Sequence, residues 1–261
     1  MGKWKSGSYL GVALLLSGLV DLARATPLRS PEYPGGVLGL ERGTLDCETG
    51  VPLDKLLDSC RGNFTLVPYS ANGKNGSKSP GELPGAKLCP GDLLFQVVME
   101  SDFDDAVARS ALATEAVTHV GIFYPPDTVI EANDFGVVET NVCEFIKKAD
   151  RNVLARVKDR SIVQSALERA KSFLGRPYSN SFLPNSEGLY CSELVTESFL
   201  NADGSRYFEL RPMNFEPESY WLEYFEALDL AIPEDVFGSH PQQILDQGGR
   251  LTPFGKILYS K

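Results

Sequence analysis

One cysteine of this chain stands where its neighbours would favour nucleophilic chemistry. Cys191 lies in residues 188–195, Gly-Leu-Tyr-Cys-Ser-Glu-Leu-Val, and the apolar spacing predicts a helix that begins at or near it. Unpaired N–H groups and the helix dipole favour a thiolate in the first turn, and the thiolate is the nucleophilic form of cysteine. The alternative is a small, inert buried thiol, because free cysteines are commonly buried. Position alone leaves both interpretations open.

Two polar residues in neighbouring apolar stretches are candidate partners of that thiol. His119 opens the predicted strand 119–124, and imidazole is the usual base for a thiol near neutral pH. Glu131 lies in the predicted strand 129–133, and the turn signal between the strands indicates an antiparallel hairpin. Their even separation places both side chains on one face if the loop has an odd number of residues. Glu131 could then orient His119, as in a triad; otherwise it is an edge-strand glutamate that faces water.

Tyr178 follows a helix stop in residues 174–179, Leu-Gly-Arg-Pro-Tyr-Ser. A phenol there could donate a hydrogen bond to a developing oxyanion beside the Cys191 N–H group, or it could simply pack its ring. The second histidine, His240, lies in a loop without periodic context and is expected at the surface.

Other catalytic signatures are absent from the sequence. It has no G-x-S-x-G, H-E-x-x-H, Walker or G-x-G-x-x-G motif, only two histidines and no C-x-x-C pair. No metal site and no cofactor are therefore expected. The formal charge of −10, without a basic cluster, disfavours nucleic-acid binding.

The elements that must position these residues follow from periodicity and turn signals. Strands are predicted over residues 93–98, 119–124, 129–133, 136–141 and 153–158, and helices from 102, over 162–174 and from 191. Residues 207–261 are aromatic-rich with scattered prolines, and we expect them to form a packing extension. Strands in a run with helices around them indicate an α+β fold.

The first 25 residues have the order of a secretory signal peptide. Lys3 and Lys5 precede an apolar stretch at 9–20, and residues 23–25, Ala-Arg-Ala, form a cleavage site. The apolar stretch is too short to span a bilayer. We expect an exported protein that starts near Thr26, without a stable membrane anchor; a buried N-terminal helix is the alternative.

Residues 26–88 are predicted to be an N-terminal extension that could shape or cover a cleft, or be mostly disordered. The extension contains sequons at Asn63 and Asn75, which matter only in a eukaryotic host. Cys47 and Cys60 bracket a short loop in it, and we expect them to form a disulfide. Cys89 and Cys143 could pair or be ordinary buried thiols, and the active-site thiol must stay free.

Several of these segments together resemble the NlpC-type papain-like cysteine hydrolases, and within them the circularly permuted YiiX-like branch. The matching segments are residues 90–96 (PGDLLFQ), 118–122 (THVGI), 129–132 (VIEA), 175–178 (GRPY) and 190–195 (YCSELV). The histidine precedes the cysteine, which is the permuted order. The resemblance runs from about residue 89 to 200 and continues more loosely beyond, so that residues 89–261 are expected to form the hydrolase domain.

The resemblance implies a papain-like α+β fold, in which an antiparallel sheet packs against helices and the nucleophile begins a helix. It implies Cys191 as nucleophile, His119 as base, Glu131 as the residue that orients His119, and Tyr178 with the Cys191 N–H as oxyanion donors. The expected activity is hydrolysis of an amide bond in a small peptide or cell-wall peptide through an acyl-enzyme.

Two other functions are weighed against this one. Lipid acyl hydrolysis or transfer is the first, because permuted relatives include proteins similar to lecithin retinol acyltransferase. The lack of an anchor and of a basic amphipathic helix leans against an acyl lipid as substrate. A secreted binding module without catalysis is the second, but neither the nucleophile nor the base is replaced.

Overall fold

A seven-stranded antiparallel sheet organises the described part of the chain, which in this computed structural model is residues 47–70, 85–111, 113, 116–184, 186–233 and 235–260. Neighbouring strands follow the order β2 (Asn63–Pro68), β11 (Leu251–Ser260), β8 (Arg151–Val157), β4 (Leu93–Val97), β5 (His119–Tyr124), β6 (Thr128–Asn133) and β7 (Gly136–Asn141). These residues belong to one compact unit.

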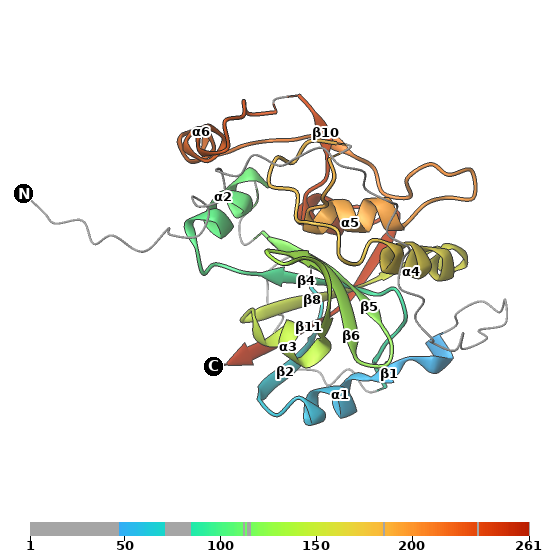
Figure 1. Cartoon of the computed structure of the whole chain (residues 1–261). Coiled ribbons are helices and arrows are strands. Elements are labelled where there is room, and N and C mark those ends of the chain that lie inside the picture. Colours follow the sequence, from blue (N-terminus) through green and yellow to red (C-terminus); the bar gives the residue numbers. More distant parts are fainter. Residues whose placement is uncertain are drawn as a thin grey trace, which may run out of the picture. The chain divides into compact units, whose positions relative to one another are not determined.

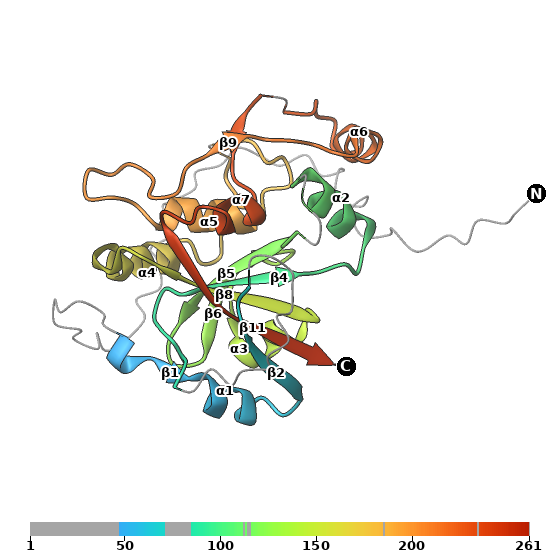
Figure 2. The same cartoon turned by 180° about the vertical axis from the view of Figure 1, so that it is seen from behind.

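Helices cover both faces of the sheet (Figures 1 and 2). One face packs against α4 (Val163–Ser172), α5 (Cys191–Ser198) and the short α7 (Pro241–Leu245). The opposite face packs against α1 (Leu53–Ser59) and α3 (Val142–Lys147). Two cores therefore lie back to back across the sheet.

This arrangement explains the pattern of the central strands. In β4, Leu93 and Phe95 enter the core beneath α4 and α5, whereas Leu94 enters the core above α1 and α3. A strand that is covered on both faces has apolar residues in succession, as β4 has from Leu93 to Phe95. The edge strand β7 instead alternates toward its end between half-buried and exposed residues.

A third cluster lies beyond the sheet, where α2 (Asp102–Ser110) and α6 (Glu218–Ala227) meet. Its buried members are Ala106, Phe182, Tyr190, Trp221 and Phe225. The remaining elements are short: β1 (Val51–Pro52) pairs with β3 (Lys87–Leu88), β9 (Arg211–Pro212) pairs with β10 (Phe237–Gly238), and 3₁₀ turns form at Cys47–Thr49 and Arg160–Ile162. Among the described residues, no helix is both long and apolar enough to cross a bilayer.

The α+β class is confirmed, but both ends of the chain contribute more to the sheet than the sequence indicates. Strand β2, from the predicted extension, pairs along its whole length with β11, from the predicted packing segment. Strand β11 contains Pro253 and Gly255, and a register shift between them lets the strand continue past the proline. The signal peptide, Asn75 and residues 26–46 and 71–84 lie outside the described residues; Asn63 is exposed at the start of β2.

The disulfides correct the expected pairing. Cys47 bonds to Cys89 and Cys60 bonds to Cys143, with Cα atoms 5.1 Å apart in each pair. The expectation of a local Cys47–Cys60 bridge is wrong, and Cys89 and Cys143, for which a mutual pair and buried thiols were both left open, each bond to one of these two cysteines instead. The reason is that α1 packs beneath α3, so that Cys60 at the end of α1 meets a cysteine distant in sequence. Cys191 is free, as expected.

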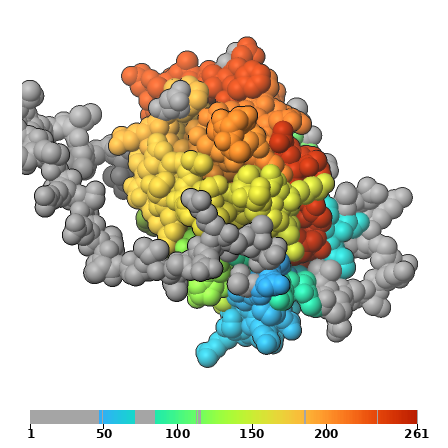
Figure 3. Space-filling model, turned by 90° about the vertical axis from the view of Figure 1, so that its right-hand side faces the viewer, coloured from blue at the N-terminus to red at the C-terminus, as the bar shows by residue number. Residues whose placement is uncertain are grey.

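The described part of the extension lies away from the α2–α6 end of the molecule. The residues of α1, blue in Figure 3, lie at one end of the surface and the orange-red residues around α6 lie at the opposite end, in agreement with Figure 1. Its described residues serve to complete the sheet and cover the core next to α3.

Candidate active site

Cys191 is the first residue of α5, as the sequence predicts. Seven of the eight residues of α5 are buried, which fixes the helix firmly against the sheet. The residue before the helix, Tyr190, has an extended backbone, and its N–H group donates to the carboxylate of Glu193 (3.4 Å). Ser192 donates to the carbonyl of Ser239 (3.0 Å), so that the start of the helix is tied to the chain before α7. The thiol is thus held on a rigid element, at an edge of a cavity.

The β5–β6 hairpin places His119 and Glu131 on one face, as expected. The loop between the strands has three residues, and Gly121 pairs with Glu131. Because His119 and Gly121 are two residues apart, their side-chain directions coincide. The His119 Nε2–H group donates to Glu131 Oε2 at 2.6 Å. Gly121 is required here, since a Cβ atom would lie 2.3 Å from Val129 Cγ1 and 3.0 Å from the Phe145 ring.

Glu131 is held by two further donors that the sequence analysis missed. Its Oε1 atom accepts hydrogen bonds from Thr140 Oγ1 (2.5 Å) and Lys148 Nζ (2.7 Å), and its side chain is only 1% exposed. Burial acts to raise the pKa of Glu131, but the bonds from His119, Lys148 and Thr140 outweigh it and lower the pKa well below its usual range. The carboxylate is therefore ionised and fixed in orientation.

The imidazole of His119 connects this carboxylate to the thiol. Burial acts to lower the pKa of His119, but hydrogen bonds to Cys191 and Glu131, and their charges, raise it to about 10. Because Nε2 is bonded to Glu131, Nδ1 is the ring nitrogen left to face the thiol. Phe145 of α3 packs beside the ring, with centroids 5.8 Å apart. The raised pKa favours the protonated form of His119 beside Cys191.

Tyr178 reaches the same cavity from another wall. Its backbone bridges to Leu189, two residues before Cys191, and this close approach requires Gly188, whose Cβ atom would lie 2.5 Å from Pro177 O. Burial and the nearby Cys191 raise the pKa of Tyr178 well above its ordinary value, so that the phenol stays protonated and can donate. The hydroxyl of Tyr190 instead accepts from the Ser239 N–H group (3.1 Å).

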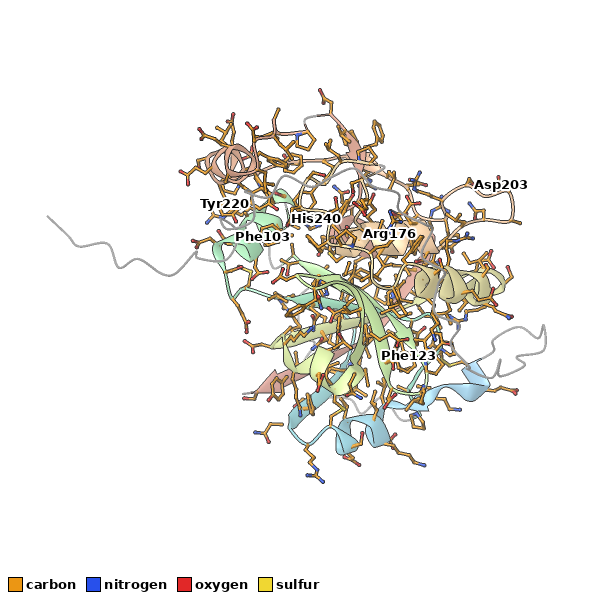
Figure 4. All side chains as sticks on the ribbon, in the orientation of Figure 1. Phe103, Phe123, Arg176, Asp203, Tyr220 and His240 are labelled. Carbon is orange, nitrogen blue, oxygen red and sulfur yellow. A yellow bond between two sulfur atoms is a disulfide. The ribbon has the colours of Figure 1, made fainter. Side chains whose placement is uncertain are left out.

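His240 corrects another expectation, because it is half-buried and lines the same cavity as Cys191. Its Nδ1 atom accepts from Gln242 N (3.0 Å), which caps α7, and its Nε2–H group donates to Val107 O (2.9 Å) in α2. Burial lowers the pKa of His240 to about 4, since an imidazolium would lose solvation there. His240 is thus neutral, and both of its ring nitrogens are engaged in holding α7 and α2 together. Figure 4 labels it beside the start of α5.

The cavity at these residues has a volume of about 400 Å³, within the range of roughly 300–1,000 Å³ typical of ligand pockets. Cys191, His119, Glu131 and Tyr178 all line it. The lining residues lie between Gln96 and Pro241, so that no described residue of the N-terminal extension takes part in it.

The fold and the site define a class. A cysteine that begins a buried helix lies against a histidine on an antiparallel strand, with the strand earlier in the chain, which is the permuted form of the papain-like cysteine hydrolases. The chain belongs to the permuted papain-like amidase family, YaeF/YiiX, C92, whose family model matches residues 87–250. It is thus a member of a family of cysteine hydrolases that act on amide bonds. A comparison with curated proteins finds no match.

A solved structure supports the fold assignment. The metalloprotein YiiX from Escherichia coli O157:H7 is 25% identical in sequence and has a TM-score of 0.54, over 63% of this chain and 94% of that chain. In the present chain, the described residues contain no group of three His, Cys, Asp or Glu side chains that could hold a metal ion. Both oxygens of Glu131 are already engaged by His119, Thr140 and Lys148.

Proposed function

We propose that this chain is an exported cysteine amidase that cleaves a small peptide or cell-wall peptide through an acyl-enzyme on Cys191. The observation that carries the proposal is the hydrogen-bonded series from Cys191 through His119 to the buried Glu131. An imidazolium beside a thiol at a helix N-terminus favours the thiolate, which is the reactive form.

The reaction follows from these positions. The Cys191 thiolate attacks the carbonyl carbon of the amide, and the negative charge moves to the carbonyl oxygen. The Tyr178 hydroxyl and the Cys191 N–H group donate to this oxyanion. His119 gives its proton to the amide nitrogen, the C–N bond breaks, and the amine leaves behind a thioester. His119 then takes a proton from water, and the hydroxide attacks the thioester carbonyl. The C–S bond breaks, the carboxylic acid is released, and the Cys191 thiolate and the His119 imidazolium are restored.

The disulfides support export. Stable disulfides are typical of oxidising compartments, and the two bridges join segments that are 42 and 83 residues apart in sequence. A chain collected from the medium of expressing cells should start near Thr26 when its N-terminus is determined by mass spectrometry. An intact Met1 in exported protein would contradict cleavage of the signal peptide.

Peptide hydrolysis tests the catalytic proposal. The wild-type chain and Cys191→Ala are incubated with a mixture of short peptides, followed by acid quenching and mass spectrometry of peptides and intact protein. We expect new amines and a transient acyl adduct on Cys191 only with the wild type. Cys191→Ala removes only the sulfur, and its thermal unfolding serves as the control for folding. Equal hydrolysis by both chains would contradict the proposal.

A further inference from the structure

The cavity at Cys191 has one strongly apolar wall. Phe103 of α2, Phe182, Phe215 and Trp221 of α6 all line it and pack against one another, with ring centroids 5.2–6.4 Å apart. Phe103 and Phe215 are only half-buried, so that their rings keep accessible surface on that wall. In Figure 4, Phe103 lies beside Tyr220, where α2 and α6 face each other. A wall of this kind would bury an apolar group of the ligand.

A fifth aromatic ring lies at the rim. Phe135, at the tip of the β6–β7 hairpin, lines the cavity but is 90% exposed. Its backbone is held at this tip, because the Phe135 N–H group donates to Asn133 Oδ1 (2.9 Å). A large apolar side chain with so little burial contributes little to the fold. Its surface is available for a ligand that enters the cavity.

The charges around the cavity exclude one kind of ligand. Glu131 is paired with His119 and Lys148, and three further carboxylates, those of Glu100, Asp104 and Asp134, line the cavity. A carboxylate on a ligand would meet like charge at these three side chains, which weakens its binding.

We infer that this site selects neutral amides with a bulky apolar group, which is held between the aromatic wall and the ring of Phe135. The inference rests on the proposed function only in taking the cavity at Cys191 as the substrate site. Two sources offer this chemistry, an aromatic residue of a peptide and a fatty acyl chain.

Binding to Cys191→Ala tests the inference without any need for turnover. The probes are acetyl-phenylalaninamide, octanamide, acetyl-glycinamide and acetyl-glutamic acid amide, and dissociation constants are obtained by NMR titration of the full chain. We expect acetyl-phenylalaninamide or octanamide to bind at least about tenfold more tightly than acetyl-glycinamide, since burial of such a group is worth at least that factor. The glutamic acid amide should bind more weakly than the glycinamide. Tighter binding of acetyl-phenylalaninamide would indicate an aromatic residue of a peptide as the natural ligand group, and tighter binding of octanamide would indicate a fatty acyl chain.

Phe135→Ala and Phe237→Ala, each added to Cys191→Ala, are the matched variants. Phe237 is 59% exposed and does not line the cavity. We expect Phe135→Ala to reduce the apolar preference about three- to tenfold, as for the loss of one aromatic contact, and Phe237→Ala to leave it unchanged. Equal binding of all four probes, or equal effects of the two variants, would overturn the inference. Selective binding by a chain that hydrolyses no amide would retain the inference and overturn the proposed function instead.

Discussion

Replacement of the buried carboxylate by an amide isolates its effect on the histidine. Glu131→Gln preserves the shape of the side chain, and an amide oxygen can still accept from His119 Nε2. The negative charge, however, is lost. Hydrogen bonds to charged groups are worth about 1.5–3 kcal/mol and neutral ones about 1 kcal/mol. The difference of about 0.5–2 kcal/mol corresponds to roughly 0.4–1.5 pKa units. No reduction for solvent screening applies, because Glu131 is 1% exposed.

The direction of the effect follows from the sign of the charge. In the wild type, Glu131 and Cys191 raise the pKa of His119 to about 10, against the opposing effect of burial. Without the Glu131 charge, the pKa of His119 should fall by about one unit. Turnover should decrease but remain measurable, since the nucleophile and the base are both still present.

The chain has only two histidines, which makes the assay simple. With labelled histidine, NMR titration should show one ring that titrates near pH 10 and a second, His240, that stays neutral from about pH 5 upward because burial lowers its pKa to about 4. In Glu131→Gln only the first ring should shift. If the pKa of His119 is the same in the wild type and in Glu131→Gln, the carboxylate does not control the charge of the imidazole, and the reasoning fails.

The same two groups set a pH range for stability. The pKa of Glu131 is lowered from 4.5, so its stabilisation is present above pH 4.5 and is lost as the pH falls through the lower folded value. The pKa of His119 is raised from 6.5, so its stabilisation is present below pH 6.5 and is lost as the pH rises through about 10. In urea unfolding, Glu131→Gln should remove the decrease in the free energy of unfolding at acidic pH. It should also make the decrease at alkaline pH smaller.

Three further outcomes are expected. Tyr178→Phe should lower kcat about 100- to 1,000-fold while Cys191 alkylation stays unchanged, because the phenol acts only on the oxyanion; an equal loss of both would contradict that role. His240→Ala should lower the free energy of unfolding by about 1–2 kcal/mol, through the lost cap of α7, without slowing alkylation; the reverse pattern would make His240 the base. Cys60→Ser with Cys143→Ser should cost about 2–4 kcal/mol in urea unfolding, because their bridge spans 83 residues; unchanged stability would contradict a structural bridge.

The arrangement of the proposed catalytic residues could be predicted because its signals are local. A helix that begins at Cys191, a strand that opens at His119 and an even offset across a turn are all visible in short windows of sequence. The structure shows that the loop has three residues, an odd number, which places His119 and Glu131 on the same face of the sheet. The alternative of a water-facing Glu131 is excluded by its 1% exposure.

The contacts that the sequence does not reveal are non-local. Lys148 approaches Glu131 from the end of α3, and no pattern in the sequence marks that approach. Thr140 could have been found, because the β6–β7 register pairs it with Val129, on the same face as Glu131. The Cys60–Cys143 disulfide follows from the packing of α1 beneath α3, which closeness in sequence does not indicate.

The most direct test of the central claim is the rate of Cys191 alkylation by iodoacetamide at pH 6. The other four cysteines are in disulfides, so that the mass of the intact chain reports on this thiol alone. An ordinary thiol with a pKa near 8.5 is under about 1% thiolate at pH 6. The account predicts fast alkylation in the wild type and a rate at least about 100-fold lower in His119→Ala. Slow alkylation of the wild type at pH 6, or the same rate in both chains, would contradict an activated nucleophile.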